Sequence, residues 1–249
     1  MTLEIALIIV SALLCVVGVY AFIVNLWLIS KYYRYNRREN SVGMTGMEFA
    51  RSILDKNGLQ HIKVKRTGSL LFGNSYSHYF KKVRLRGLIR FEKSLTSMGM
   101  GAQKAALAIL DKEGDPDMKK RIRLVPLITF GPFMFIPLLL IGFFLDYFVF
   151  NQAAVSSGLY TIIFGSIGVA LYAYSVVLAV LTLKTEKKAQ ERAYEILRVD
   201  YAITEEELVA LKELFHLYNI QYINDIILSS LELIYTALEI AIAVNSNKD

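Results

Sequence analysis

The sequence contains little charge, only three histidines and a single cysteine. Charged residues make up 20% of its 249 positions, and its mean hydropathy of +0.42 is a positive value that soluble domains rarely reach. The one cysteine, Cys15, excludes an intramolecular disulfide and a metal site built from several cysteines. These shortages exclude a disordered chain and a disulfide scaffold, and they argue against a single soluble domain.

Long uncharged segments are the most prominent feature that is present. Three segments of 22 to 26 residues carry no charged side chain: residues 5–30, 124–145 and 159–183. As helices that rise ~1.5 Å per residue, they would each span the ~30 Å hydrocarbon core of a membrane. The second segment holds three prolines, which a membrane helix tolerates when its neighbours satisfy the freed carbonyl groups. We predict an N-terminal transmembrane anchor at residues 1–30 and a transmembrane hairpin at residues 124–183.

The charged residues divide into a basic segment and an acidic one. Residues 31–123 contain 21 Lys and Arg against 8 Asp and Glu, whereas residues 184–249 contain 7 against 12. Basic residues flank all three uncharged segments on one side, and loops rich in Lys and Arg remain in the cytoplasm. The pattern predicts a multi-pass protein with its N-terminus outside and residues 31–123 in the cytoplasm. Attraction to the lipid bilayer explains the basic segment, and no nucleic-acid recognition motif accompanies it. We also expect the two oppositely charged segments to dock on each other.

Residues 31–123 carry the patterns of a small sheet with helices. A capping box at residues 45–48 predicts a helix of about three turns. Short alternating runs predict two or three strands, at residues 62–64, 70–72 and 83–85. An apolar stripe then predicts a helix over residues 94–110. The predicted fold class is an α+β integral membrane protein, mostly helical, with three or four transmembrane helices and a small cytoplasmic sheet-plus-helix region.

Residues 184–249 are predicted to form a helical tail, cytoplasmic or packed on the membrane part. A second capping box at residues 204–207 opens its main helix. Further along, Asp225, Glu232 and Glu239 are seven residues apart and share one face of an otherwise apolar stretch. Because an Asp at the centre of a bilayer costs ~2.5–3.5 kcal/mol, we expect this polar seam to face a groove or water. The stretch is long enough to cross the membrane as well.

Several sequence blocks resemble one known family. They are GMTGMEFARSILDKNGL at residues 43–59, RLVP at 123–126 and LTL at 181–183, the last followed by Glu186. With them, nearly the whole chain resembles the bacterial membrane-bound neutral zinc metallopeptidases, the YugP-like family. The resemblance implies a fold similar to the gluzincin type, with a small sheet, a zinc-binding helix and a membrane-embedded helical part. It also implies a place in the bacterial cytoplasmic membrane.

The chemistry of that family requires an H-E-x-x-H motif on the helix after the sheet. Its two histidines bind zinc, and its glutamate is the general base that activates the zinc-bound water. Aligned on the predicted helix, the motif falls on QKAAL at residues 103–107, where Gln103 and Leu107 replace the histidines and Lys104 the glutamate. Only Glu186 stands where the resemblance places a later glutamate ligand. We therefore expect no catalytic residue and no zinc or other cofactor.

No other residues in the sequence offer a replacement for the lost ligands. The three histidines include no i, i+4 pair: His61, His78 and His216. Glu186 stands among three lysines between residues 184 and 188, so it suits a salt-bridged interfacial residue better than a ligand. A lysine beside a divalent ion would also oppose binding of that ion.

Three hypotheses of function remain open. The main one is an inactive homologue of a zinc metallopeptidase, which serves as a binding, scaffold or regulatory protein for membrane proteins or a membrane protease. An alternative is an active membrane metallopeptidase that uses ligands such as Glu186 or His78. A second alternative is a small channel or transporter subunit that uses the polar seam. The sequence leaves the oligomeric state open.

Overall fold

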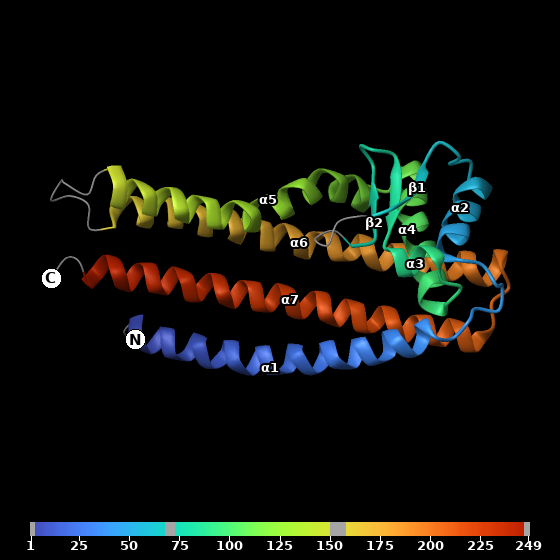
Figure 1. The fold of residues 1–249 in the computed structure, drawn as a ribbon, viewed down its shortest axis with the longest axis horizontal. Helices are drawn as coiled ribbons and strands as arrows, with labels where there is room; N and C mark the ends of the chain where they lie inside the picture. Colours follow the sequence, from blue (N-terminus) through green and yellow to red (C-terminus); the bar gives the residue numbers. More distant parts are fainter. Residues whose placement is uncertain (1–2, 68–72, 150–157, 247–249) are drawn as a thin grey trace. The chain divides into compact units, whose positions relative to one another are not determined.

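The structure, a computed structural model, describes residues 3–67, 73–149 and 158–246. They form two compact units, each of which combines distant parts of the chain (Figure 1). The apolar unit comprises residues 1–23, 123–181 and 221–249. The mixed unit comprises residues 24–122 and 182–220. The second unit contains the segments whose docking the opposite charges predicted.

The apolar unit consists of helices. Its parts belong to α1 (Leu3–Asn36), α5 (Pro116–Phe144), the π-helix η1 (Leu145–Val149), α6 (Leu159–Asp200) and α7 (Glu205–Ser246). Three stretches are long and apolar enough to cross a membrane: α1, α5 together with η1, and α6. They contain the three uncharged segments of the sequence. The last part of α7 belongs to the same unit, where the Tyr222 hydroxyl donates to the carbonyl oxygen of Ala179 on α6 at 3.0 Å.

Helices α5 and α6 approach each other closely along this unit. A Cβ atom on Gly142 would lie 2.7 Å from the Cα of Thr161, so a side chain there would force the helices apart. The carboxylate of Asp146, in η1, accepts the backbone N–H groups of Tyr160 and Thr161 at 3.0 and 2.7 Å. It thereby satisfies donors that the first turn of α6 would otherwise leave unpaired. The three prolines of the second uncharged segment, Pro126, Pro132 and Pro137, lie inside α5.

The mixed unit is built on a three-stranded sheet. Its strands are β1 (Lys63–Arg66), β2 (Ser75–Ser77) and β3 (Lys82–Leu85). The order is β1-β3-β2, with β1 parallel and β2 antiparallel to the central β3. Helices α2 (Gly46–Lys56), α3 (Gly87–Phe91) and α4 (Leu95–Glu113) accompany the sheet, and α4 packs against it and against α2 (Figure 1). The small sheet-plus-helix region is thus confirmed.

Local signals in the sequence account for the helix ends in this unit. Thr45 accepts the backbone N–H of Glu48, and the Glu48 carboxylate accepts that of Thr45, which forms the predicted capping box of α2. Ser94 caps α4 in the same way by accepting the N–H of Ser97. Gly114 ends α4 with a φ of +72°, a conformation that glycine adopts without strain. The predicted helix at residues 94–110 is therefore correct and extends by one turn.

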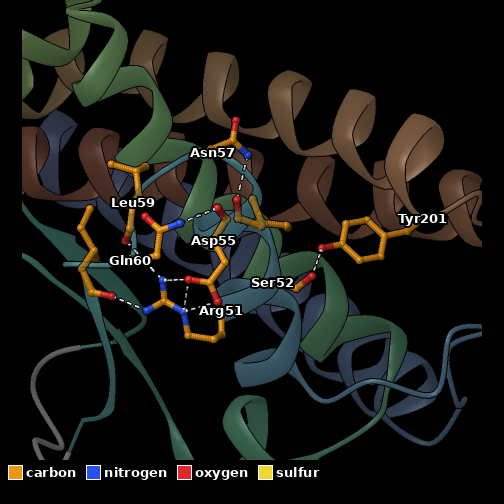
Figure 2. A network of polar contacts seen from close by, with 9 residues as sticks. Arg51, Ser52, Asp55, Asn57, Leu59, Gln60 and Tyr201 are labelled. Carbon is orange, nitrogen blue, oxygen red and sulfur yellow. Dashed lines mark hydrogen bonds and ion pairs between the residues drawn. The ribbon is translucent and has the colours of Figure 1, made fainter.

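One polar network connects α2 to the strand that follows it (Figure 2). The Arg51 guanidinium pairs with Asp55 one turn later at 2.7 Å and also donates to the carbonyl oxygens of Leu59 and Ile62. At the other side of α2, the Tyr201 hydroxyl donates to Ser52 at 2.7 Å. The conspicuous block at residues 43–59 therefore has a structural role, because it caps α2 and positions the entry to β1.

The predicted strands need one correction. The strand predicted at residues 62–64 is found one residue later as β1, and that at 83–85 lies within β3. The run at residues 70–72 falls outside the described residues, and the described strand between the other two is β2. Its sequence, Ser-Tyr-Ser, carries one apolar side chain, so it shows almost no alternation of apolar and polar residues from which a strand could be predicted. Pairing with β3 decides its conformation instead.

The basic and acidic segments dock on each other as expected. Lys31 pairs with Glu213 at 2.6 Å, and Arg38 pairs with Glu206 at 3.0 Å. The first pair joins α1 to α7, and the second joins the segment directly after α1 to the first turn of α7. At the predicted capping box of α7, the Glu207 carboxylate accepts the backbone N–H and the hydroxyl of Ser41, both at 2.6 Å. The basic and acidic segments of the sequence thus pair with each other within the mixed unit.

Candidate functional site

Helix α4 carries the QKAAL sequence at residues 103–107 and is buried within the mixed unit. All of its residues from 95 to 110 are buried. Such tight packing depends on its small residues: a Cβ on Gly101 would lie 2.3 Å from the carbonyl oxygen of Gly46 on α2. Gln103 and Lys104 are 5% and 8% exposed, and Leu107 is fully buried. Two polar side chains are therefore held inside a core and require partners.

Glu186 of α6 supplies those partners. Its Oε2 atom accepts from Nε2 of Gln103 at 3.1 Å and from Nζ of Lys104 at 3.3 Å. Its other oxygen, Oε1, accepts from a terminal nitrogen of Arg121 at 2.6 Å. We call these four residues the Glu186 cluster: Gln103, Lys104, Arg121 and Glu186. Three of the four predicted site positions thus meet, while Leu107 contributes apolar packing.

Electrostatics stabilise the ionised carboxylate in this cluster. Glu186 lies beyond the uncharged part of α6, and its side chain is 21% exposed. Burial alone would raise the pKa of the Glu186 carboxyl, but the positive charges of Lys104 and Arg121 outweigh it and lower the pKa to about 2. The cluster therefore holds one negative and two positive charges at neutral pH. Lys104 and Arg121 hold the carboxylate of Glu186, so the cluster is an ion-pair centre and not a cation-binding site.

The lysines next to Glu186 in the sequence have other partners. Lys188 pairs with Asp115 at 2.8 Å and with Asp117 at 2.5 Å, and Lys184 pairs with Asp117 at 3.2 Å. These pairs join α6 to the start of α5. The expectation that Glu186 forms salt bridges is met, but its partners come from α4 and α5 rather than from the lysines beside it.

The cluster does not fit a zinc ion. Zinc sites in this kind of protein use imidazole and carboxylate ligands, whereas the side chains gathered here are one amide, two cations and one carboxylate whose oxygens are all engaged. An ammonium 3.3 Å from the carboxylate also repels a divalent cation. Throughout the described part of the chain, no three His, Cys, Asp or Glu side chains lie close enough together to hold a metal ion.

A second polar group on α4 involves one of the three histidines. The Asp111 carboxylate accepts from the Tyr76 hydroxyl of β2 at 2.6 Å and lies 2.6 Å from Nδ1 of His78. Burial and this hydrogen bond raise the pKa of Tyr76 far above its ordinary value. Asp111 stands two turns after Gln103, about 12 Å along the helix. His78, directly after β2, therefore anchors this edge of the sheet to Asp111 of α4.

Comparison with known proteins identifies the family. The family model described as "Putative neutral zinc metallopeptidase" matches residues 8–241. The chain belongs to this zinc metallopeptidase family. It is also similar to "Putative membrane protease YugP" of Bacillus subtilis (strain 168), with 24% identity over 205 residues, 82% of this chain and 84% of the relative. No solved structure matches the chain significantly. The resemblance read from the sequence blocks is thus confirmed, and the relative together with three apolar helices indicates a membrane protein.

Arg121 is the one member of the Glu186 cluster that the sequence did not single out. It lies 65 positions before Glu186 and two residues before the block at 123–126, among other basic residues near the start of α5. Nothing in its spacing distinguishes it from Lys119, Lys120 or Arg123. Only the packing of α5 beside α6 within the mixed unit selects it as the partner of Glu186.

The polar seam of α7 has no comparable cluster. Asp225, Glu232 and Glu239 are all exposed along the helix. Glu232 lines a cavity of about 270 Å³ in the apolar unit, together with residues of α1, α5 and α6 such as Leu14, Phe135 and Tyr172. Of the three seam residues, Glu232 is thus the one that lines this small cavity.

Proposed function

We propose that this member of the zinc metallopeptidase family is a non-hydrolytic membrane protein that binds other proteins. Its partners would be segments of membrane proteins or a membrane protease that it holds or regulates. The observation that carries the proposal is the ion pair between Lys104 and Glu186, in which the ammonium occupies the position of the family's general base. A protonated lysine held by a carboxylate cannot accept the proton of an attacking water.

The packing around residues 103–107 supports a fold that is kept intact for binding rather than one that has lost its stability along with its activity. Residues 95–110 of α4 remain buried, and its caps at Ser94 and Gly114 are intact. Each side chain of the Glu186 cluster makes a hydrogen bond within it, while Nε of Arg121 is buried without one. A helix that had merely lost its metal would leave Glu186 as an uncompensated buried charge, which is strongly destabilising. Replacement of the metal by Lys104 and Arg121 keeps the scaffold stable without hydrolysis.

The charge distribution supports a position for the mixed unit in the cytoplasm, at the cytoplasmic membrane. The basic residues that follow the uncharged part of α1, precede that of α5 and follow that of α6 all belong on one side by the positive-inside rule. In this arrangement the former catalytic helix would meet cytoplasmic segments of membrane proteins.

The proposal is tested with the purified full-length chain in detergent. Elemental analysis by inductively coupled plasma mass spectrometry should find far less than one zinc per chain. Fluorescein-labelled casein, as an unfolded client, should bind in an anisotropy assay and remain uncleaved. Stoichiometric zinc with cleavage that EDTA abolishes would overturn the non-hydrolytic assignment. Absence of casein binding, with membrane-protein segments as a second probe also unbound, would overturn the binding role.

A further inference from the structure

We propose that the groove between the end of α1 and the start of α7 binds the phosphate group of an anionic phospholipid. The groove lies in the mixed unit and encloses about 740 Å³. One wall is basic, with Lys31 and Arg34 of α1 and with Arg37 and Arg38 directly after it. Its α7 wall presents carboxylates, including Glu206 and Glu213, and the small apolar surface of Val209 and Ala210.

The ion pairs in the groove directly engage two of its four basic side chains, Lys31 and Arg38. Glu213 is paired with Lys31 at 2.6 Å and accepts from the Tyr35 hydroxyl. Glu206 is paired with Arg38 at 3.0 Å, and Glu205 with Arg198 at 3.6 Å.

Arg34 and Arg37 are the two cations that remain. Both are exposed, and the structure gives neither an ion-pair partner among the residues it describes. Arg34 lies in the last turn of α1, and Arg37 directly follows the helix, where its backbone N–H still donates to the carbonyl oxygen of Tyr33 at 3.2 Å. The two residues are thus about one turn apart, so their guanidinium groups can reach the same anion. A guanidinium presents several N–H donors in a plane that matches the oxygens of a phosphate. The chemistry of the groove thus favours a phosphate ligand.

The place of the groove on α1 identifies a lipid as the source of that phosphate. Lys31 is the first charged residue after the uncharged segment at residues 5–30. The turn before it exposes Leu26, Trp27 and Ile29 by 52, 50 and 49%. Tryptophan concentrates where hydrocarbon meets the headgroups of a bilayer. A lipid whose chains follow this apolar surface would bring its phosphate to Arg34 and Arg37, whereas a free phosphate would make no use of it.

The expected strength of lipid binding follows from the positive charges of Arg34 and Arg37. A basic residue near an anionic membrane surface increases binding about fivefold, so two of them provide about 25-fold over a lipid without net charge. The preference is for phosphatidylglycerol or another net-negative lipid over phosphatidylcholine, because the latter carries its own compensating cation.

Trp27 is the only tryptophan of the chain and provides a local readout. The purified full-length protein in a non-ionic detergent is titrated with phosphatidylglycerol or phosphatidylcholine whose acyl chains carry bromine, which quenches tryptophan fluorescence on contact. Brominated phosphatidylglycerol should quench Trp27 at an at least tenfold lower mole fraction than brominated phosphatidylcholine. Equal quenching by the two lipids would overturn the proposal.

Two double variants separate the groove from charge in general. Arg34→Gln with Arg37→Gln should bring the two lipids to within about twofold of each other. Lys63→Gln with Lys65→Gln removes the same charge from exposed positions of β1 and should leave the preference unchanged. Circular dichroism confirms that both variants are folded. If the control loses the preference equally, or the groove variant keeps it, the groove is not the site.

A competition experiment distinguishes the two sources of phosphate. Unbrominated phosphatidylglycerol should relieve the quenching, whereas inorganic phosphate at the same concentration should not. Equal relief by inorganic phosphate would mean that the site takes the free ion, and the lipid assignment would be wrong.

Discussion

The ammonium group of Lys104 lies 3.3 Å from a carboxylate oxygen of Glu186, although 82 residues separate the two in the chain. By the resemblance read from the sequence, the first of these positions corresponds to the family's general base and the second to a later glutamate ligand. Here the two side chains neutralise each other, and Arg121 completes the pair from the other side at 2.6 Å. This relationship gives Lys104 and Glu186 partners of opposite charge inside the packed mixed unit.

Replacement of Lys104 by methionine should destabilise the protein. The variant keeps most of the side-chain volume but leaves Glu186 with one cation fewer, which costs ~1–3 kcal/mol for a largely buried pair. Thermal unfolding in detergent measures the loss. The matched control is Lys120→Met at an exposed position, which should have little effect. Adding Glu186→Met to Lys104→Met should recover part of the stability, and a purely additive loss in the double variant would contradict the pairing.

Restoration of the motif should restore zinc binding. In Gln103→His with Lys104→Glu and Leu107→His, the two imidazoles stand at i, i+4 on one face of α4, with Glu186 available as a third ligand. About one zinc per chain is expected by elemental analysis. The control keeps Lys104 and introduces only the two histidines, and it should bind much less zinc. Equal zinc in both variants would show that Lys104 is not what excludes the ion.

The contribution of Glu186 to stability should depend on acid pH. Because its folded-state pKa is lowered from 4.5 to about 2, the ionised carboxylate stabilises the fold above pH 4.5, and this contribution is lost as the pH falls toward 2. The full effect is on the order of 3 kcal/mol. Glu186→Gln should therefore unfold at a lower temperature than the wild type at neutral pH, with a difference that shrinks below pH 4.5.

The matched control for the pH series is Glu92→Gln, since Glu92 is exposed on the same unit. Its unfolding temperature should follow that of the wild type at every pH. A difference between wild type and Glu186→Gln that stays constant down to pH 3 would contradict the lowered pKa.

The contact between α2 and α4 should be intolerant of a single methyl group. In Gly101→Ala the new Cβ would lie 2.3 Å from the Gly46 carbonyl oxygen and 3.2 Å from its Cα, so the helices must move apart. We expect a loss of ~1–3 kcal/mol by thermal unfolding. Gly18→Ala is the control, because nothing lies within 4 Å of the added atom, and it should be neutral or slightly stabilising. Similar behaviour of the two variants would contradict the close approach.

Much of the fold was predictable because its signals are local. Uncharged runs identify the apolar helices, and the capping boxes at residues 45–48 and 204–207 mark where α2 and α7 begin. The three-residue strand β2 escaped prediction because pairing with β3, not its own composition, gives it its conformation. The run predicted as a strand at residues 70–72 lies outside the described residues.

The sequence by itself determined that the chain has long apolar helices and that it contains no H-E-x-x-H motif, because both are properties of composition and short-range spacing. Only the tertiary structure decided which cations neutralise Glu186. Lys104 and Arg121 lie 82 and 65 positions away from it, and several nearer lysines were equally plausible partners on charge alone. Their choice depends on how α4, α5 and α6 pack, since a salt bridge requires a distance of a few ångströms that no spacing in the sequence specifies.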